Sequence, residues 1–185
     1  MPQPFSQTEP SDLLVQTLGQ TYDPKAIQQM LLPLGIKRMP QPISYFNDDI
    51  IWSAKASLRL DVYRAPKINE LTAHSYSPDD GWIVGCVHFL APGSDDRIKA
   101  PYAGTLPGGL PMDTAPGDAI AAYGLPAMDE MTEWPGFSGR ILAWRTPTLN
   151  IAMEFEEGTM LRSCTFCLIG CIGSWRDDQP EIFAP

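Results

Sequence analysis

Residues 149–156 constrain the fold most, because large apolar side chains alternate with polar ones or, at Ala152, a small one. Successive side chains of a strand point to opposite sides, so this alternation predicts a β-strand with one buried and one solvent-exposed face. The exposed face would carry Glu154 and Glu156. A tight turn at residues 157–159 and an apolar run at 160–169 then predict an antiparallel hairpin.

A short helix is expected before these strands, at residues 115–123. Thr114 is placed to cap it, Pro116 suits its first turn, and Gly124 suits a left-handed stop. A polar loop follows, and residues 140–145 are expected to form another strand. The second half of the chain is therefore predicted to be one helix followed by an antiparallel meander.

The first half shows a similar order. Helices are expected at residues 11–18 and 23–31, the second capped by Asp23 with Pro24 at its first position. Alternation in residues 58–63 predicts a strand with Asp61 and Tyr63 on its exposed face. Residues 82–90 are its expected partner, while residues 64–81 are too long for a hairpin loop and predict an exposed excursion.

The junction at residues 101–111 is rich in proline and glycine, which excludes regular secondary structure there. We therefore predict an α+β fold, with short helices packed on antiparallel β-meander sheets. Two tandem helix-plus-sheet units are expected, at residues 1–96 and 97–185. One continuous domain is the alternative, in which a single intact unit carries a divergent N-terminal part. The sequence also leaves open whether the two halves share one sheet or pack as separate lobes.

Composition and charge limit the possible partners. The chain of 185 residues is 44% hydrophobic, enough for a packed core, and carries 22 acidic against 13 basic residues, a formal charge of -9. Nucleic acids and anionic membranes attract basic surfaces, so neither is an expected partner. No apolar run approaches the length of a membrane span, and the first ten residues lack the features of a signal peptide. We expect a cytoplasmic protein.

A motif at the junction resembles a known family. It reads Tyr102-x-Gly104-x-Leu106-Pro107-x-x-Leu110, and a helix ending in Tyr123-Gly124-x-Pro126 follows. This pattern resembles small bacterial immunity proteins against bacteriocins and secreted toxins, over about residues 82–170. The order of helix, Gly-x-Pro and meander is also similar to the β-lactamase-inhibitor-protein-like fold, a helical layer on a curved antiparallel sheet. Both resemblances imply a protein that binds another protein, although Gln20-Thr21 departs from the pattern in the first half.

The cysteines offer two alternative sites. Cys164 and Cys167 have zinc-knuckle spacing, which Cys171 and His88 could complete. The segment predicts a strand, however, where residues three apart point to opposite faces, so buried free thiols are the preferred interpretation. Cys86 and His88 could meet on one strand face as nucleophile and base, but no basic group nearby in the sequence would activate the thiol. We expect no metal and no cofactor.

Other catalytic patterns are incomplete. The glycines of residues 104–109 lack the Lys-Ser/Thr of a phosphate-binding loop. Six pairs of adjacent acids occur, at positions 48–49, 79–80, 95–96, 129–130, 156–157 and 177–178. They are expected in solvated turns, without the spacing of a calcium loop or the convergence of glycosidase carboxylates. Together they create a negative field that favours encounter with a basic protein.

These observations lead to one preferred function, a cytoplasmic immunity protein that covers the active surface of a cognate toxin, such as a nuclease. An adaptor or chaperone for a secreted effector is the second hypothesis, and an enzyme with an unrecognised site is the third. The expected aromatic anchors are Tyr45, Tyr76 and Trp134, each of which could instead pack locally. The expected contact residues are Asp48, Asp49, Asp61, Tyr63, Asp79, Asp80, Glu154 and Glu156.

Overall fold

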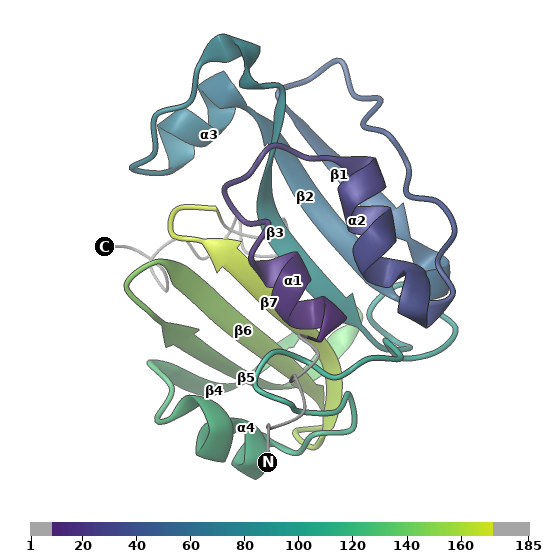
Figure 1. The fold of residues 1–185 in the computed structure, drawn as a ribbon. Helices are drawn as coiled ribbons and strands as arrows, with labels where there is room; N and C mark the ends of the chain where they lie inside the picture. The colour runs from purple at the N-terminus through teal and green to yellow at the C-terminus, as the bar shows by residue number, and fades with distance from the viewer. Residues whose placement is uncertain (1–8, 172–185) are drawn as a thin grey trace, which may run out of the picture.

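A single antiparallel sheet of seven strands organises residues 9–171, the part of the chain that the computed structural model describes (Figure 1). The strands follow the order β1-β2-β3-β7-β6-β5-β4, and the pairing of β3 with β7 joins the two halves of the chain. The predicted α+β class is confirmed, with one sheet in place of two. The strands are β1 (Asp48–Ser53), β2 (Leu58–Arg64), β3 (Trp82–Leu90), β4 (Met128–Trp134), β5 (Phe137–Arg145), β6 (Leu149–Glu156) and β7 (Met160–Leu168).

The helices are short and begin at prolines or just before them. They are α1 (Pro10–Val15), α2 (Pro24–Leu31), α3 (Ala65–Leu71) and α4 (Pro116–Tyr123), with single 3-10 turns η1 (Leu32–Leu34), η2 (Ala54–Ala56) and η3 (Pro78–Asp80). The predicted cap of α2 is confirmed, because Asp23 accepts hydrogen bonds from the first-turn N–H groups of Lys25 and Ala26. The predicted cap of α4 is wrong: Thr114 instead donates its hydroxyl to the Pro111 carbonyl.

One face of the sheet holds the main hydrophobic core. Helices α1 and α2 lie across this face in Figure 1, and α4 contributes to the same core. Leu14, Leu31 and Ala119 from the helices are buried in one cluster with Leu60 and Phe155 from the strands. Burial of a large side chain contributes about 1.5–3 kcal/mol. The apolar faces predicted for residues 58–63 and 149–156 thus lie on the face that holds α1, α2 and α4.

The opposite face is also largely buried, which the alternation did not predict. It carries one apolar cluster that includes Tyr63, Ile68 of α3 and Cys86, and a second that includes Phe137 and Ile141. Neither cluster includes the buried polar side chains of Asp61 on β2, His88 on β3, Glu154 on β6 and Thr165 on β7, which we call the polar strip. The expected exposed side of the sheet is therefore wrong for its central strands.

Two β-bulges flank this polar strip. The register between β2 and β3 shifts after Asp61 and leaves Gly85 unpaired, and the register between β6 and β7 shifts after Glu154 and leaves Arg162 unpaired. A bulge redirects a side chain and bends its strand.

The two strands that the sequence did not predict, β1 and β4, lie at the edges of the sheet. Within residues 9–171, no helix has the length and apolar character to cross a bilayer.

Candidate functional site

The loop that leads into β1 exposes three large apolar side chains within four residues. Tyr45 is fully exposed, as expected of a binding anchor, and its neighbours Ile43 and Phe46 are 84% and 78% exposed. The exposed backbone of this segment would normally leave such side chains without a defined position. Here, however, hydrogen bonds to the carboxylate of Asp49 fix the loop backbone.

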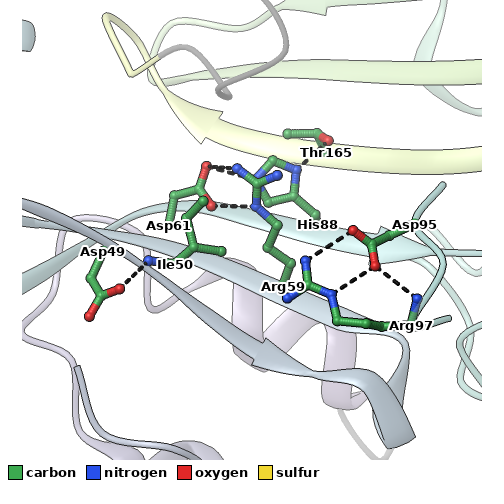
Figure 2. A network of polar contacts seen from close by, with 8 residues as sticks. All are labelled: Asp49, Ile50, Arg59, Asp61, His88, Asp95, Arg97 and Thr165. Atoms are coloured by element: carbon green, nitrogen blue, oxygen red, sulfur yellow. Dashed lines mark hydrogen bonds and ion pairs between the residues drawn. The ribbon is translucent and has the colours of Figure 1, made fainter. Parts of the chain in front are cut away.

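Asp49 is the residue that orders this loop. One of its carboxylate oxygens accepts hydrogen bonds from the backbone N–H groups of Ile43 at 2.7 Å and Ser44 at 2.9 Å. The other accepts from the N–H of Ile50 at 2.8 Å (Figure 2), and Ser44 Oγ accepts from the N–H of Phe46. Asp49 was expected in the contact surface, but it is half-buried and its carboxylate accepts backbone hydrogen bonds within its own chain.

Exposed carboxylates lie at the same end of the sheet as this loop. Asp48 begins β1, and the carbonyl of Asn47 before it accepts from the N–H of Arg64 at the end of β2. Asp79 and Asp80 form part of η3, directly before β3 begins beside Arg64. All three aspartates are exposed. We name Tyr45, Phe46, Asp48, Asp79 and Asp80 the acidic end.

The other two expected anchors pack locally. Tyr76 is half-buried and donates its hydroxyl to the Gly19 carbonyl at 2.8 Å. Trp134 is half-buried against Phe137, with ring centroids 4.4 Å apart. Of the three aromatic residues, Tyr45 is the one whose ring has no such packing role.

Four expected contact residues on the sheet do not form an exposed surface. Asp61, Tyr63 and Glu154 are only 4%, 8% and 7% exposed, and Glu156 is half-buried. Tyr63 lies against the bulge glycine Gly85, where its ring occupies the space that a Cβ would take. Alternation places these side chains opposite the main core, but it does not determine whether that side is covered.

The buried polar strip centres on Asp61 and His88. Arg59 donates to both oxygens of Asp61, from Nε at 2.7 Å and Nη2 at 2.9 Å, and His88 Nε2 lies 3.1 Å from one of them (Figure 2). His88 Nδ1 lies 2.9 Å from Thr165 Oγ1 on β7. We name Arg59, Asp61, His88 and Thr165 the buried network. It joins β2, β3 and β7 across the junction between the two halves of the chain.

Charge within the buried network is stabilised by its own contacts. Burial by itself would raise the pKa of Asp61, but the charges and hydrogen bonds of His88 and Arg59 lower it to about 2. Burial would likewise lower the pKa of His88, but the Asp61 carboxylate raises it to about 9. The network at neutral pH thus holds two cations, Arg59 and the His88 imidazolium, around one carboxylate.

The geometry gives Cys86 and His88 no catalytic arrangement. A hydrogen bond with Cys167 and burial raise the pKa of Cys86 well above its usual value, so its thiol stays neutral. Both ring nitrogens of His88 already have partners. A general base needs a free ring nitrogen within reach of the proton that it removes.

Asp61, Cys86 and His88 form the one described group with metal-ligand spacing, since their ligand atoms lie within 4.8 Å of one another. Both oxygens of Asp61 accept from the Arg59 guanidinium, whose positive charge would oppose a cation there. Cys164 and Cys167 lie in different clusters on opposite faces of the sheet, as the strand interpretation predicted. They do not converge as a zinc knuckle requires.

A pocket of about 130 Å³ adjoins the buried network. The side chains that matter most in its lining are Trp52, Arg59, Trp134, Glu154, Arg162 and Ser163. They come from β1, β2, β4, β6 and β7, and no local motif in the sequence joins them. The comparison with known proteins found no matching family model, curated protein or solved structure.

Proposed function

We propose that the protein is an immunity protein, which binds a cognate antibacterial toxin in the cytoplasm and neutralises it by covering its active surface. One observation carries this proposal: the loop before β1 exposes Ile43, Tyr45 and Phe46 and is ordered by Asp49. Clustered exposed apolar side chains typically mark surfaces that bind other proteins.

The physics of protein interfaces supports a role for this loop. Tyrosine is among the residue types that dominate binding energy, because its ring buries a large area with few rotatable bonds. A loop held before binding loses less conformational entropy when the complex forms. The hydrogen bonds from the N–H groups of Ile43 and Ser44 to Asp49 supply this order without any contribution from a partner.

Charge indicates the kind of toxin. The formal charge of -9 and the exposed Asp48, Asp79 and Asp80 favour a basic partner surface. Complementary charges raise the association rate and disfavour wrong partners. A toxin that acts on nucleic acid needs a basic active surface, so a nuclease fits this charge.

The proposed contact surface differs from the one expected from sequence. Asp48, Asp79 and Asp80 stay in it, joined by Tyr45, Phe46 and Ile43. Asp49 acts by positioning the loop. Asp61, Tyr63 and Glu154 are left out because they are buried, and we assign Asp61 to the stability of the sheet.

The test uses the toxin encoded beside the gene for this protein. The two purified proteins are mixed, and calorimetry and toxin activity report binding and inhibition. We expect a 1:1 complex without toxin activity, and Tyr45→Ala with Phe46→Ala should weaken binding at least 100-fold, as loss of two energetic centres predicts.

A matched control distinguishes contact from general exposure. Leu125 is 89% exposed outside the acidic end, and Leu125→Ala should leave affinity and inhibition unchanged. Thermal unfolding should show all variants folded, since none of these side chains is buried. A complex that leaves the toxin active would support the adaptor hypothesis instead, and no complex at all would refute the proposal.

A further inference from the structure

The pocket beside the buried network contains an arginine that differs from others in this chain. Three described arginines bind a carboxylate through both Nε and Nη2. Their pairs are Arg59–Asp61, Arg97–Asp95 and Arg140–Asp129. This two-point contact is the strongest arrangement between guanidinium and carboxylate.

Arg162 makes no such two-point contact with a carboxylate among the described residues. Its Nη1 donates to the Gly136 carbonyl at 2.7 Å, and its guanidinium lies over the Phe137 ring at 5.1 Å. Its Nε is shielded from solvent and makes no hydrogen bond. A buried donor without an acceptor costs about 1–3 kcal/mol. The bulge at Arg162 is the backbone feature that places this side chain in the pocket lining.

The lining favours an anion over a cation. Arg97 already covers the Trp52 ring at 3.7 Å, so that indole face is not open to a ligand cation. Three cationic side chains line the pocket, namely Arg59, Arg162 and protonated His88, against the carboxylates of Asp95 and Glu154. Behind the lining, Asp61 binds Arg59 and His88, and Arg97 binds Asp95, so the groups in and around the pocket carry one net positive charge.

The two carboxylates are themselves engaged. Asp95 accepts two hydrogen bonds from the Arg97 side chain, and Glu154 accepts one from Ser163 Oγ at 3.0 Å. Their charge is thus partly neutralised by contacts within the chain. Indole rings of Trp52 and Trp134 supply apolar surface in the same lining. The pocket of about 130 Å³ exceeds the space that a single water needs.

We infer that this pocket binds the carboxylate of a small aromatic organic acid. Nε and Nη2 of Arg162 would donate to the two carboxylate oxygens, as the same atoms of the other three arginines do, and the indoles would border the ring. This site is separate from the acidic end, so it does not depend on the proposed immunity function.

The test is a titration of the full-length protein with sodium benzoate, followed by NMR of backbone amides and the indole N–H groups of Trp52 and Trp134. We expect saturable shifts at both indoles and at Ser163, with sodium acetate at least tenfold weaker because it lacks the ring. Arg162→Gln should weaken benzoate binding at least tenfold. Arg140→Gln removes a similar arginine outside the pocket and should bind benzoate like the wild type.

Three results would overturn the inference. The first is an absence of saturable shifts in the pocket at 50 mM benzoate, a concentration on the order of a very weak ligand's Kd. The second is equal benzoate affinity in the wild type and Arg162→Gln, with the fold of both confirmed by thermal unfolding. The third is inorganic phosphate that binds as tightly as benzoate, which would make the pocket a general anion site.

Discussion

Replacement of His88 is the perturbation whose effect follows most directly from the buried network. The Asp61 carboxylate raises the pKa of His88 from 6.5 to about 9 in the folded protein. Because the folded-state pKa lies above the unfolded value, this stabilisation is fully present below pH 6.5. It is lost as the pH rises through 9.

The size of the effect follows from the two pKa values. One pKa unit corresponds to 1.36 kcal/mol, so the shift of His88 contributes about 3 kcal/mol at low pH. About 2 kcal/mol of this is lost between pH 6.5 and 8.5. That loss is a substantial part of the 5–15 kcal/mol typical of a folded domain. The buried thiols have raised pKa values and contribute mainly above this window.

Urea unfolding at several pH values measures this contribution. The free energy of unfolding of the wild type should fall by about 2 kcal/mol between pH 6.5 and 8.5, whereas His88→Gln should lose most of that slope. His74→Gln is the matched control, since His74 is exposed and should leave the slope unchanged. Equal slopes in the wild type and His88→Gln would refute the assignment. If His88→Gln does not fold, NMR of the His88 ring in the wild type tests the assignment instead. A titration midpoint of that ring below pH 7 would refute the raised pKa of His88.

Two further predictions concern the loop and the bulge. Asp49→Ala removes the acceptor of three backbone N–H groups, so toxin affinity should fall about tenfold and the loop amides should lose hydrogen-exchange protection. Unchanged protection would contradict that role. Gly85→Ala should cost about 1–3 kcal/mol of unfolding free energy, because the new Cβ would lie 2.4 Å from the Tyr63 ring. Gly117→Ala in α4 meets open space and should stabilise by up to about 1 kcal/mol; equal effects of the two glycine changes in chemical denaturation would refute this explanation.

Local sequence patterns predicted the elements that have one clearly buried side. Strand β6 and helix α2 have the predicted bounds or nearly so, because alternation and an Asp-Pro start are readable within a few residues. The edge strands β1 and β4 were missed. Several of their side chains are exposed on both sides, so apolar and polar residues do not alternate clearly in them.

The candidate site divides in the same way. Tyr45 and the exposed Asp48, Asp79 and Asp80 were expected at the surface, since adjacent acidic residues are typical of solvated segments. Ile43 and Phe46, the exposed neighbours of Tyr45, were not predicted as contact residues. The role of Asp49 was also missed, because its hydrogen bonds depend on how the loop folds back toward β1.

The sequence by itself determined the α+β class, most strands, the starts of α1, α2 and α4 to within one residue, and the acidic charge, all of which follow from local patterns or from composition. The prediction of an exposed excursion at residues 64–81 is wrong for α3, because its Ala65 and Ile68 are buried. Only the tertiary structure decided that both halves share one sheet, that Asp61 and Tyr63 are buried, and that Arg162 faces a pocket. The physical reason is the distance along the chain: His88 meets Asp61 across 27 residues and Thr165 across 77. Alternation states which way a side chain points, whereas pairing between remote strands decides what it meets.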